Sequence, residues 1–150
     1  MTLAESGLLD TSTVILLPRI DRTALPARAL ISSITFAELT VGPLVAKNRA
    51  DAAARLVHLL RAEALFDPLP FDAAAARAFG QVGASLRGQG RKRDARAFDA
   101  LIAAIAIANQ LPLYTCNPAD FMGIQGLEVV AVPHPDRVAS TKEDAHGDRS

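Results

Sequence analysis

One stretch, Asp99 to Phe121, constrains the fold more than any other, because it combines an apolar helix, a short strand and an acid near each end. Ala100 to Ala108 is an unbroken apolar run that is too short to cross a bilayer, so it predicts a helix buried on most of its surface. Asp99 falls in the first turn, where the amide dipoles favour a negative charge. Leu111 to Tyr114 suits a buried strand, and the polar turn from Thr115 to Asp120 follows where ligands bind in an open α/β sheet. This pairing of acids indicates a functional site and prompts a search for further acids.

The size and composition of the chain predict a single domain. With 150 residues, the chain is long enough to bury about two-thirds of its unfolded surface. We expect the folded domain over residues 1–132 and a polar, mobile tail over residues 133–150, which shows no apolar period. Cys116 is the only cysteine, so no intramolecular disulfide can form, and the N-terminus does not resemble a signal peptide. These features favour a cytoplasmic protein with no membrane segment.

The rest of the chain predicts strands alternating with helices. A short strand ends in Asp10, and the hydroxyl residues Thr11 to Thr13 are suited to cap the helix that follows. A second buried strand is expected over Leu30 to Ile34, before the sequence from Thr35 to Glu38, which has the form of a capping box. A last strand is expected over Leu127 to Val132. This order predicts an α/β sandwich with a mostly parallel sheet.

Two amphipathic helices are expected in the middle of the chain. The first begins near Ala50, and its apolar residues at one-face spacing are Ala53, Leu56, Val57, Leu60 and Ala64. Asp72 can cap the second helix, whose inward face is expected to contain Ala75, Phe79, Val82 and Leu86. Apolar spacing of this kind is typical of helices with one buried face.

Four acids occupy comparable positions in this topology. Asp10 ends the first strand and Glu38 follows the second by one helical turn, while Asp99 begins the central helix. Asp120 lies in the loop after the next strand. Such positions converge on one edge of the sheet, where four carboxylates would raise one another's pKa. A hard divalent cation, Mg²⁺ or Mn²⁺, relieves the repulsion because it prefers oxygen ligands, and it serves phosphoryl chemistry.

These residues resemble, in order, the motifs of PIN domains, and above all those of toxin ribonucleases of the VapC type. The segments that carry the resemblance lie within residues 8–132 and read LLDTSTVI, ITFAEL, DALIAAIAIANQLPLYTCNPADF and LEVV. The third segment is the most specific, because its spacing, its apolar helix and its T-x-N-x-x-D-F ending all match. The resemblance implies a three-layer α/β/α fold and an endoribonuclease that depends on Mg²⁺ or Mn²⁺. It also implies a homodimer and a cognate antitoxin that neutralises the nuclease.

The resemblance extends to individual residues. Those implied to be catalytic and to bind the metal are Asp10, Glu38, Asp99 and Asp120. Thr115 is implied to place a hydroxyl near the metal, with Asn117 and Ser12 as supporting residues. Cys116 departs from the pattern, since many relatives have an arginine there. Its thiol is expected to be a small buried hydrophobe rather than a nucleophile.

A basic run precedes the central helix. Its members are Arg91, Lys92, Arg93 and Arg96. The run can hold an RNA backbone through phosphate contacts, or it can be an ordinary solvated loop. Sixteen basic and sixteen acidic residues cancel over the whole chain, so net charge favours neither interpretation.

Each acid also has a plain structural interpretation. Glu38 can be a capping-box acid, Asp120 a turn residue and Asp10 a helix cap, although the hydroxyl residues after Asp10 are better placed for capping. Asp99 is the hardest to explain in this way, because it is a solvent-seeking charge at the head of an apolar helix. Asp94 is expected to pair with its arginine neighbours rather than join the site.

Two other functions fit part of the pattern. Phosphatases of the haloacid-dehalogenase type also begin with an acid at a strand end, but they need a second acid two residues later, where this chain has Ser12. A non-catalytic α/β binding module would keep the fold, yet it has no need of four converging acids. The motifs leave the RNA target open among transfer, ribosomal and messenger RNA.

Overall fold

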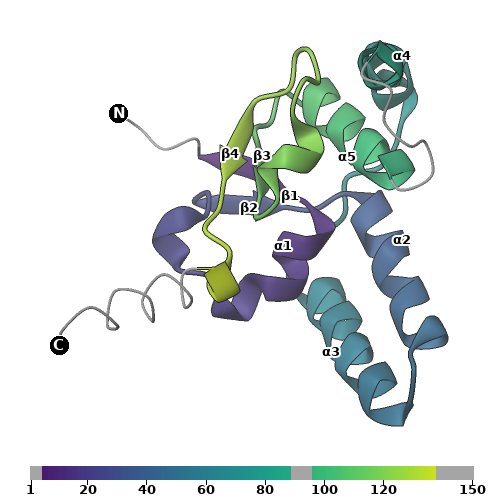
Figure 1. Ribbon diagram of the computed structural model, residues 1–150, viewed down its shortest axis with the longest axis vertical. Helices are drawn as coiled ribbons and strands as arrows, with labels where there is room; N and C mark the ends of the chain where they lie inside the picture. The colour runs from purple at the N-terminus through teal and green to yellow at the C-terminus, as the bar shows by residue number, and fades with distance from the viewer. Residues whose placement is uncertain (1–4, 89–95, 138–150) are drawn as a thin grey trace, which may run out of the picture.

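A parallel sheet forms the centre of the computed structural model, which describes residues 5–88 and 96–137. Its strands are β1 (Ser6–Leu9), β2 (Arg28–Leu30), β3 (Leu113–Thr115) and β4 (Val129–Ala131). They are arranged in the order β2-β1-β3-β4, and every neighbouring pair is parallel (Figure 1). The carboxyl ends of the strands therefore meet at one edge of the sheet. The predicted α/β architecture with a parallel sheet is confirmed.

Helices connect these strands. The α-helices include α1 (Thr11–Leu16), α2 (Ser33–Val41), α3 (Arg49–Leu65), α4 (Ala73–Gly88) and α5 (Ala97–Ala108), and residues 135–137 are also helical. The 3-10 turns are η1 (Leu17–Arg19), η2 (Arg22–Ala24), η3 (Gly42–Val45) and η5 (Pro118–Phe121). Helices α4 and α5 pack against each other, while α2 and α3 form a second pair joined by η3 (Figure 1).

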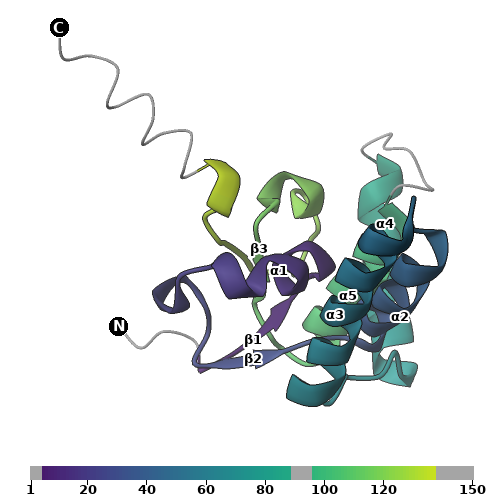
Figure 2. The same ribbon diagram turned by 90° about the horizontal axis from the view of Figure 1, so that it is seen from below.

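Side chains of the inner strands enter two separate cores. Leu8 and Leu113 belong to a cluster that contains residues of α4 and α5. Leu9 and Tyr114 belong to another cluster, which contains residues of α1, α2 and α3. Successive side chains of a strand point to opposite faces, so the two clusters lie on opposite faces of the sheet. Helices therefore cover both faces and give three layers (Figure 2).

Helix α5 is buried along most of its length, as its composition predicts. Its buried residues are Ala100 and the run Ile102–Ala106. Helix α4 packs on α5 with the predicted face, since Ala75 and Val82 are fully buried. Burying an aliphatic side chain such as that of Val82 contributes about 1.5–3 kcal/mol. This packing fixes the first turn of α5 beside the sheet.

Two helix starts differ from the sequence prediction. Helix α2 begins at Ser33, because Ser32 is the N-cap and accepts a hydrogen bond from the backbone N–H of Thr35 at 3.0 Å. The expected second strand is present, but it spans Arg28–Leu30 rather than residues 30–34, and the capping box that ends at Glu38 is wrong. Helix α1 is capped by Asp10 rather than by the hydroxyl residues after it. In both cases, the side chain directly before the first turn satisfies a free N–H group of the helix.

The apolar stripe of α3 faces solvent. Leu56, Val57 and Leu60 have exposed fractions of 43%, 51% and 53%, whereas Ala62 is buried. Helix α3 packs with α2 and η3 as a pair that extends beyond the sheet (Figures 1 and 2). The prediction of the helix is confirmed, but the implied burial of its stripe is wrong. A sequence period shows which residues share a face, not whether that face meets the protein's own core.

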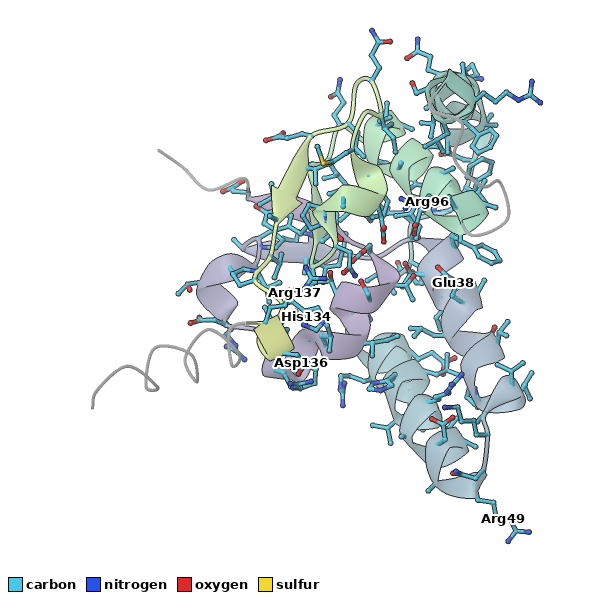
Figure 3. The ribbon with its side chains drawn as sticks, in the orientation of Figure 1. Glu38, Arg49, Arg96, His134, Asp136 and Arg137 are labelled. Carbon is cyan, nitrogen blue, oxygen red and sulfur yellow. The ribbon has the colours of Figure 1, made fainter. Side chains whose placement is uncertain are left out.

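The described part of the C-terminal segment contacts the domain. Asp136 forms an ion pair with Arg19 of η1. His134, Asp136 and Arg137 lie together beside this turn (Figure 3). The domain boundary at residue 132 stays a prediction, and residues 138–150 lie outside the described range. Within that range, no helix has both the length and the apolar character needed to span a membrane.

Candidate functional site

Asp10 lies at the carboxyl end of β1, where it is almost completely buried. Its Oδ1 atom accepts hydrogen bonds from the backbone N–H and the hydroxyl of Thr13. Its Oδ2 atom accepts hydrogen bonds from Thr115 at 2.7 Å and from Ser12 at 3.2 Å. An ionised carboxylate only accepts hydrogen bonds, so four donors suit it well and fix its orientation.

The segment after β3 supports the hydroxyls around Asp10. The side-chain amide of Asn117 donates to Ser12 Oγ at 3.1 Å, and its backbone N–H donates to Thr115 Oγ1 at 2.9 Å. The backbone N–H of Cys116 donates to the Thr13 hydroxyl at 3.1 Å. Each hydroxyl that donates to Asp10 therefore also accepts a hydrogen bond from this segment. Burial raises the pKa of the Cys116 thiol, which suits the small buried hydrophobe that was predicted.

Glu38 lies on α2, one turn after Thr35 and opposite Thr11 of α1. Its Oε1 atom accepts a hydrogen bond from the Thr11 hydroxyl at 2.6 Å. Burial raises the pKa of Glu38; the Thr11 hydrogen bond opposes this rise, and the negative charge of Asp10 adds to it. Because α2 begins at Ser33, Glu38 lies beyond the first turn and is not a capping residue.

Asp99 lies in the first turn of α5, half-buried, and its pKa is the most strongly affected. Burial raises the pKa of Asp99 to about 7, with the negative charges of three other acids adding to the rise, namely Asp120, Asp10 and Glu38. The positive charge of Arg96 opposes it. Charges shift a pKa appreciably only over short distances. Asp10, Glu38 and Asp120 therefore lie close enough to the start of α5 to act on Asp99.

Asp120 pairs with Arg96, a member of the basic run that was predicted to contact RNA. Arg96 Nη1 lies 3.3 Å from Asp120 Oδ1 and donates to the backbone carbonyl of Asp120 at 2.9 Å. The pair ties η5 to the start of α5, on the side of the molecule that also carries Glu38 (Figure 3). The other members of the basic run, Arg91, Lys92 and Arg93, lie outside the described residues, as does Asp94.

The donor set fits a hard divalent cation in its chemistry. The four carboxylates supply only oxygen atoms. Burial raises the pKa of Asp99, and the repulsion from the other acids that adds to this rise is of the kind that a cation relieves. In the described part of the chain, no three acidic, histidine or cysteine side chains already stand together as a ligand set. Hydrogen bonds fix the carboxylates of Asp10 and Glu38, so rotation of the Asp99 and Asp120 side chains would accompany binding.

A cavity of about 480 Å³ adjoins Glu38 between α1, α2 and α3. Its lining includes Thr11, Ile15, Glu38, Leu39, Arg55 and His58. His58 is half-buried, and its Nδ1 atom has no hydrogen-bond partner within the described residues. Burial lowers the pKa of His58, and the positive charge of Arg61 lowers it further. This wall of the cavity is therefore neutral at His58 near pH 7.

Three hydroxyls of the site are missed by the sequence motifs. Thr13 was interpreted as a helix cap, as was Thr11, and Thr35 as the start of a capping box. In the structure, Thr13 donates to Asp10, while Thr11 and Thr35 lie beside Glu38. The signal that could reveal them is a hydroxyl residue within three positions of an acid.

Comparison with known proteins identifies relatives of similar length. The PIN domain family matches residues 8–121 of the chain. A curated relative, Ribonuclease VapC5 of Mycobacterium tuberculosis, is 33% identical over 134 residues, which cover 87% of this chain and 96% of that protein.

Solved structures share the fold. A crystal structure of a member of the VapBC family of toxin–antitoxin systems, VapBC-5 from Mycobacterium tuberculosis, is similar with a TM-score of 0.73 and 32% identity. That match covers 85% of this chain and 99% of the other. DNA-bound VapBC from Salmonella typhimurium has a TM-score of 0.64 and 26% identity, over 85% of this chain and 97% of that one.

Proposed function

The chain belongs to the PIN domain family, and from that membership we propose that it is an endoribonuclease, the toxin of a toxin–antitoxin pair, which hydrolyses RNA at its acidic site. One observation carries the proposal: the pKa of Asp99 is raised to about 7, by burial and in addition by the negative charges of three other acids. Those acids come from separate parts of the chain. A non-catalytic module does not require such a group, and a phosphatase of the haloacid-dehalogenase type would need a second acid where this chain has Ser12.

The residues that would hold the cation, Mg²⁺ or Mn²⁺, are Asp10, Glu38, Asp99 and Asp120. When bound, the cation supplies positive charge to the phosphate in the transition state and orients the attacking water. Thr13 and Thr115 hold the carboxylate of Asp10 in one orientation. Asp99 lies in the first turn of α5, where the negative charges of the other three acids act on its carboxyl group.

A titration with Mn²⁺ tests the cation site. We expect the wild-type chain to bind Mn²⁺, and we expect the amide variants Asp10→Asn, Glu38→Gln, Asp99→Asn and Asp120→Asn to bind at least about tenfold more weakly, the loss typical of removing even an outer-shell partner. Asp67→Asn is the matched control, since Asp67 is exposed and outside the site. Wild-type affinity in the Asp99→Asn variant would contradict the assignment.

We also propose that the basic run contacts RNA phosphates, with Arg96 contributing less because it is paired with Asp120. Replacing Arg91, Lys92 and Arg93 by glutamine should reduce the slope of log K against log salt by about 2, or about 0.7 for each phosphate that is no longer neutralised. Arg49→Gln is the control, because Arg49 lies at the far end of α3 (Figure 3). An unchanged slope in the triple variant would identify the run as a solvated loop.

The antitoxin is proposed to dock on the α2–α3 pair. The apolar stripe, defined as Leu56, Val57 and Leu60, is exposed there, and Leu44 of η3 is 85% exposed. Grouped exposed apolar side chains mark interaction surfaces. The cavity between these helices reaches Glu38. An amphipathic antitoxin helix can therefore cover the stripe while a neighbouring arginine reaches the acids and competes with the cation.

Co-expression with the neighbouring upstream reading frame tests this partner. We expect the pair to copurify and the frame to relieve the toxicity of the chain. Leu60→Asp should abolish copurification, because it places a charge in the stripe, whereas Glu63→Ala on the exposed remainder of α3 should leave the complex intact. A complex that survives Leu60→Asp would contradict the docking surface, and growth that is unaffected with or without the frame would contradict the toxin role.

A homodimer is proposed as well. The alanine-rich helices can pack closely against a second copy, and light scattering should give twice the chain mass of 15.8 kDa. A monomer at micromolar concentration would contradict this assembly. An RNA substrate and a cognate antitoxin both suit a cytoplasmic location.

A further inference from the structure

A line of hydroxyl groups leads from the N-cap of α2 to Glu38. Ser32 Oγ donates to Thr35 Oγ1 at 3.4 Å, Thr35 Oγ1 lies 3.0 Å from Thr11 Oγ1, and Thr11 Oγ1 donates to Glu38 Oε1 at 2.6 Å. Ser32 and Thr35 are fully buried. We call these three residues, Ser32, Thr35 and Thr11, the hydroxyl relay.

The protons of the relay can run in only one direction when Glu38 is ionised. A carboxylate only accepts, so the single proton of the Thr11 hydroxyl is committed to Glu38. The Thr11 oxygen must then accept the proton of Thr35, and Thr35 in turn accepts from Ser32. Ser32 is anchored because its Oγ also accepts the backbone N–H of Thr35 at 3.0 Å. Every hydroxyl thus donates once, and the chain of donors ends on the carboxylate.

The relay also joins two helices that are distant in sequence. Thr11 is the first residue of α1 and directly follows Asp10, whereas Thr35 and Glu38 lie one turn apart on α2. The hydrogen bonds from Thr11 therefore fix the Glu38 side chain relative to the strand end that carries Asp10. A free glutamate side chain has several rotatable bonds, and holding it in one rotamer has an entropic cost that this fixed donor offsets.

We propose that Thr11 and Thr35 are positioning residues that hold the Glu38 carboxylate, through the hydroxyl relay, in the orientation needed for a divalent cation. This inference rests on the proposed function, because it assumes that Glu38 contributes to cation binding. It assigns a purpose, separate from helix capping, to Thr35 within the ITFAEL segment and to Thr11 within the LLDTSTVI segment. Neither threonine touches the cation in this account.

Titration with Mn²⁺ is the test, with Thr35→Val as the first variant. Valine keeps the shape of threonine and removes the donor, so affinity for Mn²⁺ should fall about tenfold, as for the loss of other outer-shell partners. Thr35→Ser keeps the hydroxyl and should restore the affinity. Thr40→Val is the matched control, because Thr40 lies on the same helix, is exposed, and donates only to the backbone carbonyl of Ala37. Thr11→Val, at a partly exposed position, carries the test if Thr35→Val fails to fold.

A double-mutant cycle separates positioning from a general structural role. In the Glu38→Gln background, Thr35→Val should cause no further loss of Mn²⁺ affinity, because it acts only through the carboxylate. A loss of equal size in both backgrounds would overturn the relay. If Glu38→Gln weakens binding while Thr35→Val and Thr11→Val do not, the relay fails and the proposed function stands. If the Glu38→Gln variant binds Mn²⁺ with wild-type affinity, the proposed role of Glu38 in cation binding is refuted, and the relay is refuted with it.

Discussion

Replacing Asp99 by asparagine should stabilise the metal-free protein while abolishing its activity. The asparagine keeps the shape of the side chain but removes a charge that lies half-buried among Asp120, Asp10 and Glu38. Below pH about 4, Asp99 is protonated in both the folded and the unfolded chain, so the charge costs nothing. Between pH about 4 and about 7, the unfolded chain loses the proton while the folded chain retains it, and stability therefore falls as the pH rises. Above pH about 7, Asp99 is ionised in both the folded and the unfolded chain, and the full cost of its buried charge lowers the stability of the folded chain.

The size of the effect follows from the pKa of Asp99. A rise from 3.8 to about 7 corresponds to at most about 4 kcal/mol, at about 1.4 kcal/mol per pKa unit. Solvent screens a partly exposed carboxylate, so we expect about half of this value, or about 2 kcal/mol. Removing an active-site charge can stabilise a protein while it abolishes activity, because active sites often require groups that destabilise the fold.

Urea denaturation in the presence of EDTA measures this difference. The free energy of unfolding of Asp99→Asn should exceed that of the wild type by about 2 kcal/mol at pH about 8 and by almost nothing near pH 4. Asp67→Asn should show no such dependence, since Asp67 is exposed and distant in sequence from the site. A gain of the same size at both pH values, or no gain at the higher pH, would refute the electrostatic explanation.

Three further substitutions test neighbouring features. Thr115→Val should lower the free energy of unfolding by about 1.5–3 kcal/mol, since it removes a buried hydrogen bond to the Asp10 carboxylate, and urea denaturation measures the loss. Gly7→Ala should cost about 1–3 kcal/mol in the same assay, because its Cβ would lie 2.6 Å from Cδ2 of the Tyr114 ring. Arg96→Gln should raise the pKa of Asp99 further, since the Arg96 charge lowers it, and a carbon-13 NMR titration of the metal-free protein reads this directly.

The sequence predicts the parts of the fold that depend on local pattern. The apolar run of α5 and the face of α4 that contains Ala75 and Val82 are both buried as expected. The starts of α1 and α2 were predicted less well, because several adjacent residues can serve as a cap and only the path of the chain selects Asp10 and Ser32. The sequence could not show whether the apolar face of α3 is buried or exposed. The spacing of its apolar residues is the same whether that face packs on the protein's own core or binds a partner.

The acids of the candidate site follow from the sequence better than their surroundings do. A charge at the head of an apolar helix, as at Asp99, is costly and therefore conspicuous. The hydroxyls that orient these acids are less conspicuous, because Thr11 and Thr35 also suit helix starts. Their contacts join residues 24 and 27 positions apart, and such contacts depend on how α1 meets α2.

RNA cleavage by the purified chain tests the central claim most directly. The 5′ ends of the fragments should be mapped with Mn²⁺, with EDTA, and with the Asp99→Asn variant, whose fold is checked by circular dichroism. We predict cuts at defined positions with Mn²⁺, 5′-phosphate ends on the fragments, and no cuts in the other two conditions. Cleavage at the wild-type rate by folded Asp99→Asn, or in EDTA, would contradict a metal-dependent nuclease built on these four acids.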